Sequence, residues 1–185
     1  VRKASPDDIE GIMDVASSVG NSEKEHESGF LMDDYTGNPD YYAQKFLKLI
    51  NKLDHFYVVE DGFILGFMIA YSKDEWISFN PGWIEDVMWS PGFDMKSTDK
   101  FVLVDKPAIH KDFTARGLGS LLYDPLIQDI KSEDITDIFA ETLISPVPNF
   151  ASLNFRIKQN YRLAGVRYED YKGTSYTDLV YHKTI

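Results

Sequence analysis

The most constraining feature of the sequence is an apolar run that passes through a glycine-containing turn into an amphipathic segment. Residues 101–109, F-V-L-V-D-K-P-A-I, are typical of a buried strand, and T-A-R-G-L-G follows at residues 114–119. Apolar residues then recur at helical spacing up to Ile130. Glycine lets a backbone approach a ligand closely, and the first amides of a helix have no partners within it. The pattern therefore predicts a strand, a turn and a helix start that can bind a diphosphate, although two such glycines can also serve tight packing alone.

A second strand and helix follow this unit. Residues 137–144 are typical of a strand, and residues 149–159, N-F-A-S-L-N-F-R-I-K-Q, have helical spacing and are followed by Asn160 and Tyr161. The two units together resemble the GNAT family of acetyl-CoA-dependent N-acetyltransferases. The phosphate loop of that family runs Gln/Arg-x-x-Gly-x-Gly/Ala, and Gly117 and Gly119 match its second half, whereas Thr114 stands at its first position. The segment from Asn149 to Tyr161 is similar to the family's Asn-x-x-Ser/Ala-x-x-Phe-x-x-x-x-Gly-Phe helix.

The resemblance covers nearly the whole chain, because V-R-K-A-S-P-D-D-I-E looks like the family's first strand and helix, and residues 57–71 look like its central hairpin. It implies one α/β domain over residues 1–185, with a mixed, mostly antiparallel sheet of about seven strands and about four helices. It also implies acetyl-CoA as co-substrate. The cofactor-binding residues that it implies are Ala108, Ile109, His110, Thr114, Ala115, Arg116, Gly117, Leu118, Gly119, Ser120, Asn149, Ser152, Phe155 and Arg156.

Four residues are candidates for the chemistry of acyl transfer to an amine. An alkylammonium group has a pKa near ~10.4, so a base must accept its proton at neutral pH. Asp105, in the middle of a predicted strand, is the first candidate base, and a salt bridge to Lys106 or to an arginine is its alternative role. Glu141 is the second candidate base. Tyr161, like Tyr123, is a candidate acid.

The acid is the point at which this chain departs most from the family. Many members have a proton-donating tyrosine seven residues after the helix asparagine, and Arg156 stands at that position here. A guanidinium does not give up its proton in ordinary chemistry, but its charge can stabilise a thiolate.

Composition narrows the classes of function. The chain of 185 residues has no cysteine, which excludes disulfides and an acetyl-enzyme thioester, so we expect direct transfer. Its formal net charge of −11 disfavours binding to nucleic acid and is compatible with a cationic acceptor, or with solubility alone.

Four scattered histidines show no metal-ligand spacing, so no metal is expected. No segment has the ~18 apolar residues of a membrane span, and the expected location is the cytoplasm.

The rest of the chain supplies expected elements. A strand at residues 1–4 precedes a helix that Ser5 caps, residues 20–39 are a loop that could cover the acceptor site, and residues 40–53 form a helix. Asp61-Gly62 predicts a tight hairpin between strands 56–59 and 63–71. Strands at 163–171 and 175–182 close the chain, and Pro125 should bend the helix after the glycine turn.

Residues 73–100 are the least regular part and contain all three tryptophans. This aromatic insertion could contribute to acceptor recognition or to a homodimer, or it could be an extended hairpin that folds on its own core.

The function favoured by the sequence is direct transfer of an acetyl group from acetyl-CoA to a primary amine of a small molecule or protein. A CoA-binding sensor without transferase activity is one alternative, because Thr114 and Arg156 depart from the family pattern. An acyltransferase with a different acyl donor is another.

Overall fold

The protein is built on one eight-stranded sheet, in a computed structural model that describes residues 1–20 and 29–185. The strands are β1 (Arg2–Lys3), β2 (His55–Glu60), β3 (Ile64–Ser72), β4 (Met88–Trp89), β5 (Phe101–Ile109), β6 (Asp137–Ser145), β7 (Arg162–Tyr171) and β8 (Thr174–Thr184). Their order is β1-β2-β3-β5-β6-β8-β7-β4, in which β5 and β6 are parallel and the other neighbours antiparallel. The prediction of an α/β fold with a mixed, mostly antiparallel sheet is confirmed, with one strand more than the expected seven.

The helices are more numerous than expected. They are α1 (Ile9–Ser18), α2 (Pro39–Lys52), α3 (Lys73–Phe79), α4 (Trp83–Asp86), α5 (Leu118–Leu121), α6 (Tyr123–Ser132) and α7 (Phe150–Lys158), with 3-10 turns η1 (Pro6–Asp8), η3 (Met95–Thr98) and η4 (Lys111–Phe113). The predicted helix after the glycine turn is divided into α5 and α6. A proline ring clashes with the carbonyl four residues earlier, and for Pro125 that residue is Leu121, where α5 ends.

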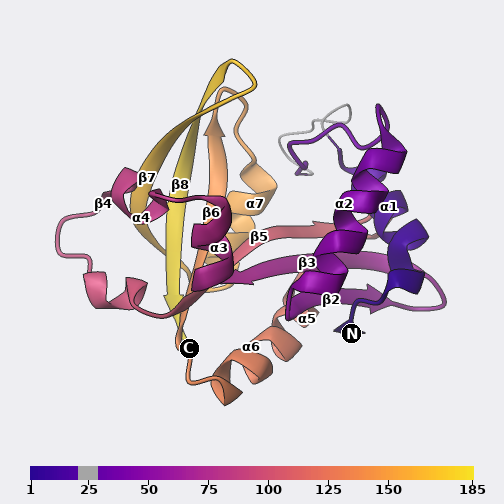
Figure 1. Cartoon of the computed structure of the whole chain (residues 1–185), viewed down its shortest axis with the longest axis horizontal. Coiled ribbons are helices and arrows are strands. Elements are labelled where there is room, and N and C mark those ends of the chain that lie inside the picture. Colours follow the sequence, from indigo (N-terminus) through magenta and orange to yellow (C-terminus); the bar gives the residue numbers. More distant parts are fainter. Residues whose placement is uncertain (21–28) are drawn as a thin grey trace.

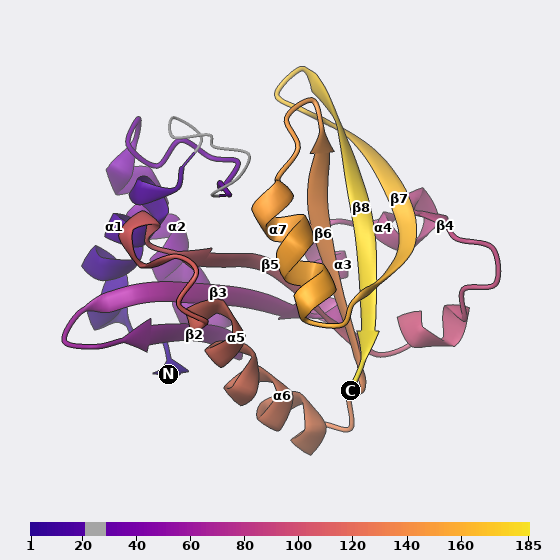
Figure 2. The same ribbon diagram turned by 180° about the vertical axis from the view of Figure 1, so that it is seen from behind.

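Helices cover both faces of the sheet, and each face has its own apolar core (Figure 1). On one face α1, α2, α3 and α4 pack against Phe101, Leu103 and Phe139. On the other, α6 packs through Leu126 and Ile130, where Figure 2 shows α5, α6 and α7 in front of the strands. Successive residues of a strand face opposite sides, so the apolar run of β5 is buried on both.

Residues 73–100 do not form the extended hairpin that was one expectation. They fold into α3, α4, η3 and β4, and β4 pairs with β7 at the edge of the sheet. Trp83 is 1% exposed, with ring centroids 5.6 Å from Phe101 and 5.7 Å from Phe139. The aromatic residues of this segment therefore join the core of the sheet rather than make a core of their own, which the local sequence pattern did not reveal.

The hairpins that the sequence predicts are present. β2 and β3 are joined around Asp61 and Gly62, and Gly62 has the positive φ of 75° that such a turn favours. β7 and β8 pair along their length at the end of the chain. Of the predicted loop 20–39, residues 21–28 with His26 lie outside the described residues. In the two described parts of the chain, no helix is long and apolar enough to cross a bilayer.

Candidate active site

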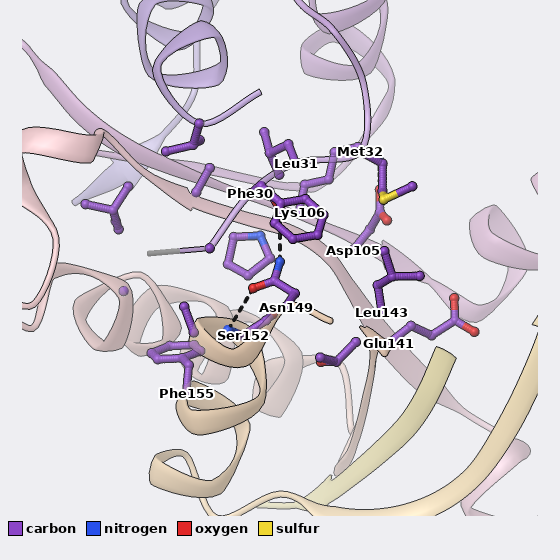
Figure 3. A pocket seen from close by; sticks show the side chains of 18 of the residues that line it. Phe30, Leu31, Met32, Asp105, Lys106, Glu141, Leu143, Asn149, Ser152 and Phe155 are labelled. Atoms are coloured by element: carbon purple, nitrogen blue, oxygen red, sulfur yellow. Dashed lines mark hydrogen bonds and ion pairs between the residues drawn. The ribbon is translucent and has the colours of Figure 1, made fainter. Parts of the chain in front are cut away.

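The two parallel strands at the centre of the sheet separate halfway along their length. β5 and β6 pair only from Phe101 with Asp137 to Val104 with Ala140. Beyond this point the described residues of each strand have no partner on the side facing the other, and a cavity of about 650 Å³ opens between them. We call Val104 and Ala140 the apex of the split. The cavity also reaches α5, α7, the segment 29–35 and the β7–β8 hairpin, and Figure 3 shows its lining from close by.

A β-bulge places Asp105 at this apex. Ala70 of β3 pairs with Val104 and Ile69 pairs with Lys106, so Asp105 is the extra residue of β5. The Asp105 carboxylate and the Lys106 ammonium form an ion pair of 2.5 Å within the cavity lining. Burial lowers the pKa of Lys106, but the adjacent Asp105 carboxylate outweighs this effect and raises it above its ordinary value. The ion pair is the alternative that the sequence allowed for Asp105, and it leaves this carboxylate neutralised.

The glycine turn presents open backbone to the cavity. Gly117 precedes α5 with φ at 82°, and no atom would lie within 4 Å of a Cβ placed there. Ala115 also has positive φ, at 61°. Leu122, between α5 and α6, keeps helical dihedrals, so the two form one bent helix that begins at this turn. Predicted cofactor residues on the lining here are Thr114, Ala115, Gly117, Leu118, Gly119 and Ser120.

Gly119 and Ser120 hold the turn against α7. A Cβ on Gly119 would lie 3.1 Å from the Phe155 ring, so glycine here serves close packing. Ser120 Oγ accepts a hydrogen bond of 2.7 Å from Gln159 Nε2. Gly117 therefore has the open backbone that a ligand site needs, and Gly119 has the packing role that was the alternative for such glycines.

His110 and Arg116 do not line the cavity, in contrast to Ala108 and Ile109. The His110 ring lies beside Asp14 and Asp112, and its Nδ1 accepts from the Asp112 amide at 3.3 Å. The Arg116 guanidinium lies over the Phe113 ring, at 4.9 Å, and donates to the Asp112 carbonyl. The 3-10 turn η4 redirects the chain between β5 and α5, and spacing in the sequence did not predict that turn.

Asn149 joins α7 to the segment before α2. Its Oδ1 accepts from the Ser152 amide at 3.1 Å, and its Nδ2 donates to the Phe30 carbonyl at 2.9 Å (Figure 3). Phe30, Leu31 and Met32 thereby lie over the cavity. Of the described part of the predicted loop, residues 29–33 and Tyr35 line one side of this cavity. The side-chain amide of Asn149 thus connects the start of α7 to the segment that carries Phe30.

Arg156 lines the cavity from α7, whereas Tyr161 does not. Arg156 Nη1 donates to the Tyr123 hydroxyl at 2.9 Å, and that hydroxyl lies 3.1 Å from the Tyr161 hydroxyl. Burial raises the pKa of Tyr161 well above its ordinary value. Tyr161 thus lies in the core behind Arg156, which makes a direct role as acid unfavourable.

Glu141 lies on β6, one residue beyond the apex, and lines the cavity. Its Oε1 accepts from Trp83 Nε1 at 2.9 Å and lies 3.2 Å from Arg167 Nε. Burial raises the pKa of Glu141 to about 8, although Arg167 and the Trp83 hydrogen bond oppose the shift. Of the two carboxylates that the sequence proposes, Glu141 has the pKa suited to a general base near neutrality.

Sequence reasoning missed three residues of this lining or its support: Trp83, Thr142 and Arg167. Trp83 belongs to the aromatic insertion that the sequence did single out, but its contact with Glu141 is 58 residues away along the chain. Thr142 Oγ1 is buried without a hydrogen-bond partner among the described residues. No local pattern distinguishes such a threonine from an ordinary strand residue.

Comparison with known proteins gives matches at the level of structure. No family model and no curated protein sequence matches the chain. PaiA N-acetyltransferase from Thermoplasma acidophilum, solved with coenzyme A, has a TM-score of 0.62 and 17% identity, covering 100% of this chain and 97% of its own. Polyamine N-acetyltransferase from Drosophila melanogaster has a TM-score of 0.61 and 12% identity, covering 100% and 98%. Ribosomal-protein-alanine N-acetyltransferase from Brucella melitensis has a TM-score of 0.58 and 15% identity, covering 100% and 98%. At these identities the likeness shows a shared fold.

Proposed function

We propose that this chain, whose fold is that of the GNAT N-acetyltransferases, transfers an acetyl group from acetyl-CoA to a cationic primary amine. The observation that carries the proposal is the cavity between β5 and β6, which joins the open turn at Gly117 to the buried carboxylate of Glu141. One ligand that spans this cavity can place its phosphates at the turn and its reactive end near the apex.

The lining fits the parts of acetyl-CoA. Backbone amides at the start of a helix receive phosphate oxygens, and Gly117 leaves this helix start uncovered. The backbone of Ala108 and Ile109 lies on the open edge of β5, where an amide-containing pantetheine chain can pair as a strand would. The buried, unpartnered Thr142 Oγ1 and Arg156 Nε are polar groups that a bound molecule would satisfy.

Glu141 is the proposed general base. The Glu141 carboxylate takes one proton from the ammonium group, directly or through water. The neutral amine nitrogen then forms a bond to the thioester carbonyl carbon and releases its second proton to water. The carbon–sulfur bond then breaks and its electron pair remains on sulfur, giving the amide and the CoA thiolate. Asp105 is the other candidate, but its carboxylate is engaged by the Lys106 ammonium at 2.5 Å.

The acceptor end of the cavity carries several carboxylates. Asp33, Glu169 and Asp178 line it together with Glu141, and burial raises the pKa of Asp178 to about 6. Tyr171 at the tip of the β7–β8 hairpin donates to Asp33 at 3.2 Å, so this end is enclosed from above. Opposite charges attract, and the net charge of −11 acts in the same direction, so a protonated amine is drawn here. The cell's pool of acetyl-CoA makes the cytoplasm the proposed location.

The proposal is tested by following CoA thiol release from acetyl-CoA with a panel of acceptors that includes an alkyl diamine and a peptide with a free N-terminus. We expect release that depends on the amine, with one acetyl group added to the acceptor by mass. Acetyl-CoA binding without release for any amine would favour a CoA-binding sensor instead. Failure to bind acetyl-CoA would contradict the proposal.

A further inference from the structure

Arg156 is a buried cation without an anionic partner. Its side chain is 1% exposed, and no described residue places a carboxylate within ion-pair distance of its guanidinium. The other buried arginine, Arg167, forms ion pairs with Glu141 and Glu169. Removing one partner of a buried ion pair typically costs about 3 to 5 kcal/mol because the remaining charge is uncompensated. In the part of the chain that the structure describes, carboxylates therefore lie against the guanidinium group of Arg167 and none lies against that of Arg156.

The groups that surround Arg156 do not supply the missing charge. They are Tyr123 from α6, Tyr161 beyond α7, and Tyr181 and Lys183 from β8. Burial raises the pKa of Tyr161 and of Tyr181, so both remain neutral near pH 7. Lys183 adds a second cation, with Nζ 5.8 Å from the Tyr123 ring and 5.9 Å from the Tyr161 ring. Among the described residues no side chain supplies an anion to Arg156, whereas a ligand in the cavity can do so.

Register locates this cation near the apex of the split. The charge of Arg156 acts on Tyr181, and Tyr181 pairs with Ala140, the last residue of β6 that pairs with β5. Glu141 follows Ala140 directly, so the proposed base and the unpaired cation flank the inner end of the cavity. The Gly117 turn belongs to the outer connection between β5 and α5. The reacting sulfur of the cofactor is thus the anion expected at Arg156, and the phosphates are expected at the turn.

We propose that Arg156 stabilises the CoA thiolate released by acetyl transfer, with its guanidinium held in place by the Tyr123 hydroxyl. This inference rests on the proposed function. The carbon–sulfur bond breaks with both electrons on sulfur, the guanidinium neutralises the new charge, and the thiolate takes its proton from water after it leaves. A general acid is not needed for this route, which accounts for an arginine where a proton donor was expected.

The test measures the ionisation of bound CoA rather than turnover. The ultraviolet absorbance of the thiolate is followed from about pH 5 to about pH 10 in the wild-type complex, with the desulfo-CoA complex as the blank. A cation in contact typically lowers the pKa of an acidic group by about 1 to 3, and we expect that change for the bound thiol relative to free CoA. Above the thiol pKa of free CoA, the wild-type protein should bind CoA about tenfold or more tightly than desulfo-CoA.

Variants separate the charge from its surroundings. Arg156→Met should restore the thiol pKa of free CoA and remove the preference over desulfo-CoA, whereas Arg156→Lys should keep part of both. Tyr161→Phe, which alters a neighbouring hydroxyl but not the guanidinium, should leave the thiol titration unchanged. Should Arg156→Met fail to fold, the wild-type titration and Arg156→Lys still decide the matter.

Each other outcome overturns a distinct claim. An unperturbed thiol in the wild-type complex overturns the thiolate assignment. Equal weakening of CoA and desulfo-CoA by Arg156→Met overturns it in favour of a phosphate contact. Absence of binding by either cofactor overturns the proposed function itself.

Discussion

Glu141 is the residue on which the proposed chemistry most depends. Its carboxyl is buried next to Arg167 and Trp83, and its pKa of about 8 means that only a minority of molecules carry the ionised base at pH 7. A base with a pKa near the working pH combines adequate ionisation with sufficient basicity to accept a proton from an ammonium group. Activity is therefore expected to respond to pH through this single side chain.

We predict that kcat/KM of the wild-type enzyme rises with pH and levels off above about 8, as Glu141 ionises. Glu141→Gln should lower kcat by about 10² to 10⁴, the usual contribution of a general base, and should leave acetyl-CoA affinity unchanged. The measurements are initial rates across the pH range and calorimetric titration of acetyl-CoA. A rate retained within a factor of two in the variant would exclude Glu141 as the base.

Stability gives a second, independent prediction for the same residue. The folded-state pKa of about 8 lies above the ordinary value of 4.5, so the folded protein retains a proton that the unfolded chain loses. The stability contributed by Glu141 is full below about pH 4.5 and is lost as pH rises through about 8. Glu141→Gln cannot ionise, so its melting temperature relative to wild type should be higher at about pH 9 than at about pH 5. A constant difference across this range would contradict the raised pKa.

At the scale of elements, the insertion of α3, α4 and β4 both completes the core and positions the base. Trp83 packs on Phe101 and Phe139 and donates its indole N–H to Glu141. A hydrogen bond to a carboxylate stabilises the charged form and lowers its pKa. This segment, for which the sequence left several roles open, therefore supports the candidate site from the opposite face of the sheet to α7.

Trp83→Phe should raise the apparent pKa in the kcat/KM profile by about 1, because it removes this donor and keeps an aromatic ring. Trp89→Phe is the matched control, since Trp89 Nε1 donates to the Ile84 carbonyl at 2.9 Å and not to Glu141. The control should lose stability without a displaced pH profile. Displacement of both profiles by the same amount would show that loosening of the insertion, and not the hydrogen bond, sets the pKa.

Local signals predicted most elements but not the contacts between them. The turn at Gly62 and the helix bend at Pro125 each depend on neighbouring residues, and the structure contains both. The α3–α4 insertion depends on packing against strands far away in the chain, so its residues gave no regular period. Ala115 and Gly117 line the cavity and belong to a local turn motif, so the sequence identified them. Arg167 lines the cavity through contacts with distant residues, so no local motif identified it.

At the scale of the whole molecule, the proposed function rests on the way one sheet divides. Pairing of β5 with β6 holds the two halves together at one end, and its loss beyond the apex opens the cavity at the other. Figure 1 shows β2, β3 and β5 lying across the view while β6, β7 and β8 lie along its vertical direction. All eight strands belong to one sheet, which supports the proposal of a single domain over residues 1–185.

The central claim is that acetyl-CoA occupies this cavity with its diphosphate at the Gly117 turn, and calorimetric titration of acetyl-CoA into two variants tests it most directly. Gly117→Asn and Gly117→Asp have side chains of the same size, and both residues tolerate the positive φ of 82°, so they differ in charge at the turn. The account predicts that Gly117→Asn binds within a few-fold of wild type and that Gly117→Asp binds at least about tenfold more weakly than Gly117→Asn. Equal affinities in two folded variants would place the diphosphate elsewhere and contradict the account.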